Sequence, residues 1–210
     1  MTKLLTENNS HVFICGLTRS GKTYFAKNAV AQLKRPVVFF NVQNEQMPGR
    51  FIEVNERADF KLIKKHLAAG GKIDFRFSQA CSLAQIQAII GFVIRSLMKD
   101  HYTQQKPIYV VIDEAQLLSN KGLEAAIDAS TRGLSRGVRL ICISQRPALV
   151  SKTIYTQASE HYIFRLQDGE KMYMQNKGVD FEKCKQLWQQ NGQYSYVFTD
   201  GFITEGRRAI

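Results

Sequence analysis

Residues 16–23 constrain this chain more than any other stretch. They read Gly-Leu-Thr-Arg-Ser-Gly-Lys-Thr and fit the phosphate-loop pattern G-x-x-x-x-G-K-[ST] at every fixed position. The apolar residues 11–15 before the loop predict a short buried strand, and residues 24–34 after it have the apolar spacing of a helix. This strand–loop–helix context is the one in which the pattern binds phosphate, and it argues against a chance glycine-rich turn. The apolar face of the predicted helix consists of Phe25, Ala26, Ala29, Val30 and Leu33.

The loop residues have separable chemical roles. Glycine lets the backbone curl so that successive N–H groups point at an anion, and the start of the next helix adds partial positive charge. Lys22 can reach the β- and γ-phosphates, and the Thr23 hydroxyl can bind Mg²⁺. The sequence therefore predicts ATP and Mg²⁺ as cofactors. The expected nucleotide-binding residues are Gly16, Thr18, Arg19, Ser20, Gly21, Lys22, Thr23 and Tyr24.

A second motif follows the apolar run 108–112, which ends directly in Asp113 and Glu114. A buried strand would deliver Asp113 to the sheet edge that carries the phosphate loop, where it can hold Mg²⁺ through water together with Thr23. Glu114 can orient and deprotonate an attacking water. On its own, such an acidic pair is more often a helix cap or a surface pair. Beside a phosphate loop, the glutamate favours hydrolysis, because an enzyme that transfers phosphate to a small acceptor must exclude water.

A third motif is the apolar run 139–143, which ends in Ser144-Gln145-Arg146-Pro147. A strand ending in a polar amide can place that amide between the two catalytic strands. Gln145 could there hydrogen-bond the γ-phosphate or the attacking water and sense hydrolysis. The alternative is an exposed polar residue at the end of a strand.

The rest of the chain alternates apolar strands with amphipathic helices, which predicts a doubly wound α/β fold with a mostly parallel sheet flanked by helices. The Asp200-Gly201 pair predicts an antiparallel C-terminal hairpin. Ser82 is the expected N-cap of a long helix, and the alternation in residues 73–77 predicts a strand with one wetter face. The expected strands are 37–42, 51–54, 73–77, 108–112, 138–144, 161–166, 193–199 and 202–206. The expected helices are 58–69, 83–99, 123–129, 168–176 and 181–190.

Size and charge bound the remaining possibilities. With 210 residues, the chain is expected to form one domain over 1–210. The longest nearly apolar run, residues 88–94, is too short to cross a membrane, and the polar N-terminus lacks a signal-peptide core, so a soluble intracellular protein without a transmembrane segment is expected. The 29 Lys and Arg against 18 Asp and Glu give a net charge of +11, which suits a polyanionic partner such as nucleic acid.

The three motifs together, residues 16–23, 108–114 and 144–147, resemble the FtsK–HerA superfamily of ring-shaped DNA-pumping ATPases. The resemblance spans residues 12–166 and is greatest to its short members, the genome-packaging ATPases of membrane-containing icosahedral viruses. It implies a RecA-like (ASCE) P-loop fold and ATP hydrolysis that drives sequence-independent translocation of double-stranded DNA. One departure is Asn41, which stands where many relatives carry an acidic residue, with Glu45 further along.

The resemblance also implies partners and a location. It implies a homo-oligomeric ring, a hexamer or a pentamer, acting in the host cytoplasm or in association with the virion. A capsid vertex or viral membrane protein would then be a further partner. The alternatives within the superfamily are a cellular or plasmid DNA-pumping ATPase. Three further alternatives are an ATP-dependent filamentous-phage assembly factor, a small-molecule kinase and a nucleotide-gated DNA-binding module.

The same resemblance implies an arginine that reaches into the neighbouring subunit's ATP, from the basic stretch 131–139. Arg132 and Arg136 are the candidates, and the spacing does not choose between them. Residues 43–50 and 168–177 could form mobile pore loops, and Tyr194, Tyr196 and Phe198 are expected to make core or subunit contacts. The lysines that could bind DNA phosphates are Lys61, Lys64, Lys65, Lys72, Lys121 and Lys152, although a lysine of this kind is more often an ordinary solvated surface residue.

Overall fold

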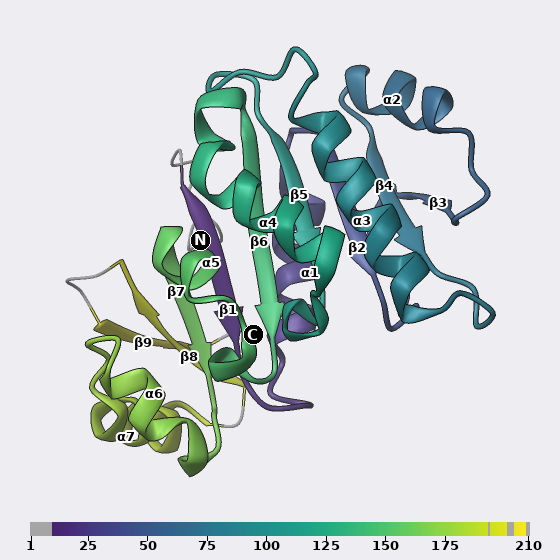
Figure 1. The fold of residues 1–210 in the computed structure, drawn as a ribbon. Helices are drawn as coiled ribbons and strands as arrows, with labels where there is room; N and C mark the ends of the chain where they lie inside the picture. The colour runs from purple at the N-terminus through teal and green to yellow at the C-terminus, as the bar shows by residue number, and fades with distance from the viewer. Residues whose placement is uncertain (1–9, 193, 201–203, 209–210) are drawn as a thin grey trace.

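A single mixed sheet organises the computed structural model, which describes residues 10–192, 194–200 and 204–208 (Figure 1). In these residues the sheet has nine strands in the order β3-β4-β2-β5-β6-β1-β7-β8-β9. Strands β1 to β7 pair in parallel, and β8 and β9 add an antiparallel C-terminal pair. The predicted mostly parallel sheet with an antiparallel end is therefore confirmed, while Gly201 of the predicted turn lies outside the described residues. The strands are β1 His11–Cys15, β2 Val37–Asn41, β3 Ile52–Val54, β4 Lys72–Arg76, β5 Ile108–Ile112, β6 Val138–Ser144, β7 Ala158–Phe164, β8 Ser195–Thr199 and β9 Thr204–Arg208.

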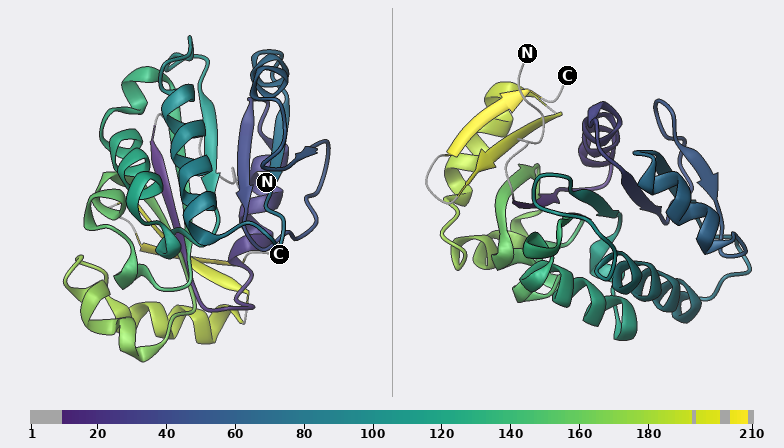
Figure 2. Two further views of the ribbon diagram at one scale, coloured as in Figure 1. Left: turned by 45° about the vertical axis from the view of Figure 1, so that its right-hand side comes forward. Right: turned by 90° about the horizontal axis from the view of Figure 1, so that it is seen from above.

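Helices cover both faces of the sheet, as Figure 2 shows most clearly from above. Side chains alternate along β1: Phe13 and Cys15 enter the core shared with α3 and α4, whereas Val12 and Ile14 enter the core shared with α1. Burial on both faces explains why the central strands read as continuous apolar runs. The helices are α1 Lys22–Gln32, α2 Phe60–Ala68, α3 Leu83–Leu97, α4 Asn120–Arg132, α5 Lys152–Gln157, α6 Lys171–Gln175 and α7 Phe181–Asn191.

The strand order positions the three motifs. β6 lies between β5 and β1, with Ile112 of β5 paired to Cys142 of β6 and Ser144 of β6 paired to Cys15 of β1. The carboxyl ends of all three strands therefore meet at one sheet edge. As predicted, the strand that ends in Gln145 is the central one.

Several element bounds differ from the prediction. Helix α4 is longer than the expected 123–129, and β7 starts at Ala158 rather than at residue 161. The expected helix 168–176 is a 3₁₀ turn followed by the short α6. Helix α5 was not predicted; its β-branched composition disfavours a helix, but Ile154 and Tyr155 are buried in the core, so packing outweighs local propensity. The Ser82 N-cap is confirmed, with a reciprocal capping box to Gln85.

The predicted wet face of residues 73–77 is wrong, because the side chain of Asp74 is fully buried. Its Oδ1 accepts a hydrogen bond of 2.9 Å from Asn41 Nδ2, and its Oδ2 pairs with Arg76 Nε at 2.8 Å. β4 lies between β3 and β2, and these partners compensate the charge there. Asn41 Nδ2 also donates to the backbone carbonyl of Glu45 at 2.6 Å, so this amide joins β4 to the segment after β2.

Among the described residues, no helix is long and apolar enough to span a membrane.

Candidate active site

The phosphate loop is fixed between two strands. Gly16 N–H donates to the carbonyl of Ser144 at 3.1 Å, and Leu17 N–H donates to the carbonyl of Arg165 at 2.8 Å. A Cβ on Gly16 would lie 2.5 Å from Phe164 Cβ, so this position admits only glycine. Gly21, at φ +94°, has the left-handed backbone that glycine adopts most readily, and it caps the start of α1. These contacts hold the loop at the carboxyl edge of the sheet.

Two side chains of the phosphate-loop motif, those of Ser20 and Lys22, are buried. Lys22 is 4% exposed, and its Nζ lies 3.5 Å from the carbonyl oxygen of Leu17. Desolvation lowers the pKa of Lys22, and the charges of Glu114 and Asp113 partly oppose that shift. The Ser20 hydroxyl is buried with no hydrogen-bond partner among the described residues. An anion in the loop would satisfy both groups.

Asp113 has the environment of a cation ligand. The residue is 1% exposed, and its Oδ1 accepts the N–H of Glu114 at 3.1 Å. Its Oδ2 is buried without a hydrogen-bond partner in the part of the chain that the structure describes. Burial, and secondly the charge of Glu114, raise the pKa of Asp113 to about 6. A buried carboxylate with one orphaned oxygen fits Mg²⁺, which typically binds one or two protein carboxylates together with substrate phosphates.

Glu114 is enclosed by three glutamine amides. Its Oε1 accepts hydrogen bonds from the Nε2 groups of Gln145, at 2.6 Å, and of Gln43, while its Oε2 accepts from Gln116. The residue is 6% exposed and has a φ of +56°, an uncommon conformation for a non-glycine residue. The carboxylate is therefore held in one orientation by its backbone and by three donors.

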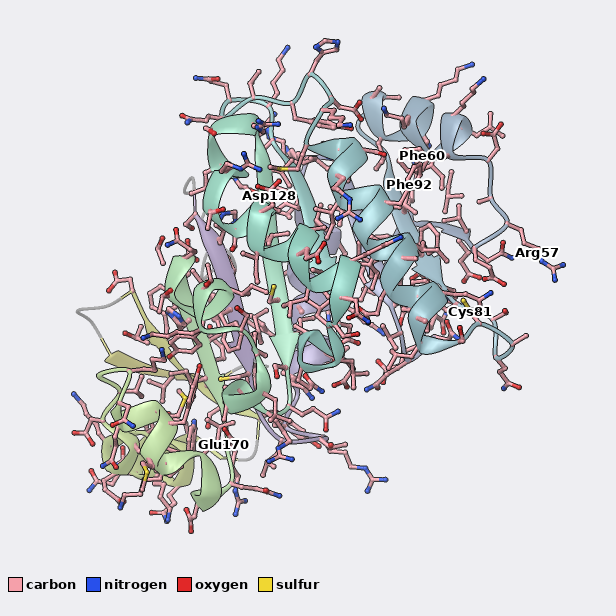
Figure 3. The ribbon with its side chains drawn as sticks, in the orientation of Figure 1. Arg57, Phe60, Cys81, Phe92, Asp128 and Glu170 are labelled. Carbon is pink, nitrogen blue, oxygen red and sulfur yellow. The ribbon has the colours of Figure 1, made fainter. Side chains whose placement is uncertain are left out.

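Gln145 connects this carboxylate to the phosphate loop. Its Oε1 accepts a 2.6 Å hydrogen bond from the Thr18 hydroxyl, while its Nε2 donates to Glu114. The turn that carries Gln145 is itself tethered, because Glu170 accepts the N–H of Ala148 at 3.1 Å. Glu170 lies at the lower left of Figure 3, below the carboxyl edge of the sheet.

The structure thus brings Lys22, Asp113, Glu114 and Gln145 to one edge, as the sequence motifs predict. Gln43 and Gln116 were not predicted, although both follow closely after strands that end at this edge. Gln116 also accepts hydrogen bonds from the Ser144 hydroxyl and the Gln145 N–H. The sequence signal that could have identified Gln43 and Gln116 is their position just beyond the ends of apolar strands.

The two candidate arginines lie elsewhere. Arg132 is the last residue of α4 and Arg136 follows that helix, just before the start of β6, so both lie at the opposite edge of the sheet from the loop. Arg132 is paired with Asp128, one turn earlier on α4 and labelled in Figure 3, and its side chain is 62% exposed. Arg136 donates to the carbonyl of Met98 at 3.2 Å. Neither arginine serves the site of its own chain.

Of the residues predicted to contact DNA, the core or another subunit, some are buried inside the chain and others are exposed. Lys72 donates to the carbonyls of Val30 and Ala31 and so binds the end of α1 rather than standing free. Tyr196 is buried against Phe25 with ring centroids 4.9 Å apart, as expected for a core residue. Tyr194 is 44% exposed.

Comparisons with known proteins agree with this geometry. A comparison with curated protein sequences gives no significant match. Among solved structures, the DNA-packaging ATPase B204 of Sulfolobus turreted icosahedral virus is similar, with a TM-score of 0.64 and 14% identity over 98% of this chain and 100% of that chain. The genome-packaging NTPase B204 of Sulfolobus turreted icosahedral virus 2, in complex with ATPγS, has a TM-score of 0.61 and 13% identity over the full length of both chains. The plasmid coupling protein TrwB, in complex with a non-hydrolysable GTP analogue, has a TM-score of 0.60 and 11% identity over 97% of this chain and 79% of that chain.

At these identities the likeness shows the fold, and it confirms the predicted RecA-like P-loop fold and the resemblance to viral packaging and FtsK–HerA-type ATPases. The model of the family described as the AAA domain matches residues 5–146. Because that match covers well over half of the 210 residues, the chain belongs to the AAA domain family.

Proposed function

We propose that this chain is a Mg²⁺-dependent ATPase that moves double-stranded DNA from within a homo-oligomeric ring and packages a viral genome into a preformed capsid. The observation that carries the ATPase part is the amide of Gln145, which bonds both Thr18 of the phosphate loop and Glu114. A side chain that bonds both the phosphate loop and a carboxylate can link the presence of a γ-phosphate to the orientation of that carboxylate. Residues 1–210 act as one domain in this proposal.

The site residues take distinct roles. Lys22 and the loop N–H groups bind the phosphates, and Mg²⁺ held by Thr23 and Asp113 would neutralise charge on the β- and γ-phosphates. Glu114 Oε2 accepts one amide, so a second lone pair remains for the proton of an attacking water. Gln145 Nε2 carries a second N–H, which can donate to the γ-phosphate while the first holds Glu114.

The DNA-moving part rests on charge and on the relatives. The net charge of +11 favours a polyanion, and the similar structures include a protein described as a DNA-packaging ATPase and a plasmid coupling protein. Two of the similar structures are viral genome-packaging ATPases, and this likeness is the support for the packaging role. Action in the host cytoplasm or at the virion, near a capsid vertex, follows from that role.

One titration tests this proposal. ATP hydrolysis is measured against the concentration of duplex DNA, and the mass of the protein is determined with and without nucleotide. A DNA pump should show faster hydrolysis as duplex DNA is added, and a ring-sized mass. A hydrolysis rate that does not change with the DNA concentration would contradict the coupling of ATP hydrolysis to DNA movement and would favour a kinase or an unrelated ATPase. Nucleotide binding without multiple turnover would leave only a nucleotide-gated binding module.

Within a ring, Arg132 is the better candidate for reaching the neighbouring subunit. Its guanidinium is exposed and oriented by Asp128, whereas that of Arg136 is bonded to the end of α3. Permanent charge and a forked shape suit arginine to phosphate oxygens. Mixing an Arg132→Ala variant with a Lys22→Ala variant, each inactive alone, should restore activity. The same mixture made with Arg136→Ala serves as the comparison, and no recovery at any ratio would reject the role of Arg132 in the neighbouring site.

A further inference from the structure

A cavity of about 470 Å³ lies at the amino edge of the sheet, the edge opposite to the proposed ATP site. Its walls come from the segment between α1 and β2, from the end of α2 and from the segment between α3 and β5. The amino ends of the strands point toward the top of Figure 1. The volume falls in the range of ligand sites in proteins, about 300–1,000 Å³, and no step of the proposed hydrolysis uses this cavity.

The inner wall of the cavity is apolar. Leu67, near the end of α2, is 1% exposed, and Pro36, Pro107 and Tyr102 line the cavity with it. Burial, and secondly the charge of Asp100, raise the pKa of Tyr102 to about 12, so this phenol stays neutral at physiological pH. An apolar group that enters the cavity leaves water for an apolar surface, which favours its binding.

Four Lys and Arg side chains surround the opening of the cavity. Lys34 and Lys106 are exposed, and Arg35 is half-buried. The fourth, Lys64, is paired at 2.5 Å with Asp100, the single acid among the described residues of the lining. The other three have no ion pair and no side-chain hydrogen bond within residues 10–192, 194–200 and 204–208. Three positive charges at the opening are therefore left for a ligand.

The ends of helices are another reason for positive charge at this edge. Helices α1, α2 and α3 all end here, and cations stabilise the carbonyl ends of helices. Lys72 donates to two carbonyls at the end of α1, and Arg136 donates to one just beyond α3, so this role explains both of them. Lys34, Arg35 and Lys106 donate to no carbonyl in the part of the chain that the structure describes, so they are not explained in this way.

The apolar wall and the basic opening together favour an acidic peptide over nucleic acid. Duplex DNA could contact the three cations, but its stacked bases would leave the apolar wall in water. An unstacked base needs hydrogen bonds to its edge, and the described lining holds no amide side chain and one hydroxyl, that of Tyr102. An aromatic or long aliphatic side chain needs no such bonds, and carboxylates beside it can pair with lysine and arginine.

We propose that this cavity binds an acidic segment of a partner protein. One large apolar side chain of that segment packs against Leu67, and the carboxylates of its neighbours pair with Lys34, Arg35 and Lys106. Such a site has the usual organisation of a peptide interface, with a buried anchor and charges at the rim. The site lies at the other edge of the sheet from the phosphate loop, so this inference does not rest on the proposed ATPase function.

The first arm of the test varies the ligand and leaves the chain unaltered. The probe is a labelled peptide with one phenylalanine between two runs of three glutamates, and its affinity for the full chain is measured by fluorescence anisotropy. Two matched probes are the same peptide with alanine in place of phenylalanine, and a single strand of seven thymidines, which has the same number of negative charges. This arm is independent of how any substitution affects folding.

The second arm varies the chain. Ala68→Trp fills the cavity from an exposed position in α2, and Ala69→Trp, the next residue, is exposed and outside the lining. Lys106→Glu reverses one charge at the opening, and Lys99→Glu makes the same change in net charge at an exposed position outside the lining.

The phenylalanine peptide should bind about tenfold or more tightly than either matched probe, because only it fills the cavity. Ala68→Trp should remove about the same factor and Lys106→Glu about threefold or more, while both control variants bind as the unaltered chain does. Equal binding of the phenylalanine and alanine peptides would reduce the effect to general charge attraction and overturn the proposal. Tighter binding of the thymidine strand would assign the cavity to nucleic acid, and binding of no probe would also overturn it.

Discussion

Replacing Glu114 by glutamine separates the chemical role of this residue from its structural one. The substitution keeps the shape of the side chain and removes its basicity, so ATP should still bind while turnover stops. Loss of a general base costs about 10²–10⁴ in rate, which sets the expected fall in kcat. Glu124→Gln, an exposed acid on α4, is the matched control and should leave the rate unchanged.

The three amide donors around this carboxylate add a second expectation. In Glu114→Gln one of the two oxygens becomes an NH₂ group that faces a glutamine Nε2 donor. A buried donor without an acceptor costs about 1–3 kcal/mol, and about 1 kcal/mol moves the melting temperature by roughly 2–4 °C in a chain of this size. The variant should therefore melt a few degrees lower as well as hydrolyse slowly.

The assay is steady-state release of phosphate together with ATP affinity and a melting curve on the same preparation. Normal turnover by Glu114→Gln would refute the assignment of the base. Slow turnover with an unchanged melting temperature would instead refute the geometry of the three amides, because the clash of donors would then be absent.

Three further predictions concern other buried groups. Lys22→Ala should abolish tight ATP binding and reduce turnover by about 10²–10³-fold, as expected when a phosphate-stabilising donor is lost, and binding and rate assays would reveal any retention of either. Asp74→Ala should lower the free energy of unfolding by about 2–3 kcal/mol, because Asn41 and Arg76 lose their buried partner, whereas Asp74→Asn should lose less; urea denaturation measures both. Burial lowers the pKa of His11 to about 4. The His11 imidazole therefore takes up a proton less readily in the folded state than in the unfolded state. Its contribution to the free energy of unfolding is complete above its ordinary pKa of 6.5 and should be lost as the pH falls toward 4. An identical loss between pH 7 and pH 5 in a His11→Asn variant would assign the effect to another group.

The catalytic edge was predictable because each of its motifs is local in the sequence. The loop pattern before α1, the acidic pair after β5 and the glutamine after β6 each sit at the end of an apolar run. Parallel strands whose ends share an edge then bring Lys22, Asp113, Glu114 and Gln145 together without further information. The central position of β6 was likewise expected from the role of its glutamine.

The features that the sequence could not predict depend on contacts between segments that are far apart in the chain. The alternation in residues 73–77 predicted a wetter face that would include Asp74, and only the position of β4 between β2 and β3 buries this side chain beside Asn41. The contact of Gln43 with Glu114 joins residues 71 positions apart, and no local pattern marks it. Helix α5 forms against its local propensity because its apolar residues complete the core.

The arrangement of amides at the catalytic edge gives a physical reason for glutamine, rather than an acid or a shorter amide, at position 145. Its oxygen accepts from Thr18 and one of its two N–H groups donates to Glu114. The second N–H remains for a phosphate oxygen. The side chain can therefore contact Thr18, the Glu114 carboxylate and a bound phosphate without breaking either existing hydrogen bond. A glutamate here would place a second carboxylate against Glu114, and an asparagine would be one methylene too short to keep the 2.6 Å contacts at both ends. The phosphate loop and the Glu114 carboxylate are thus joined through one side chain, so a ligand in the loop that moves Gln145 would also move the carboxylate.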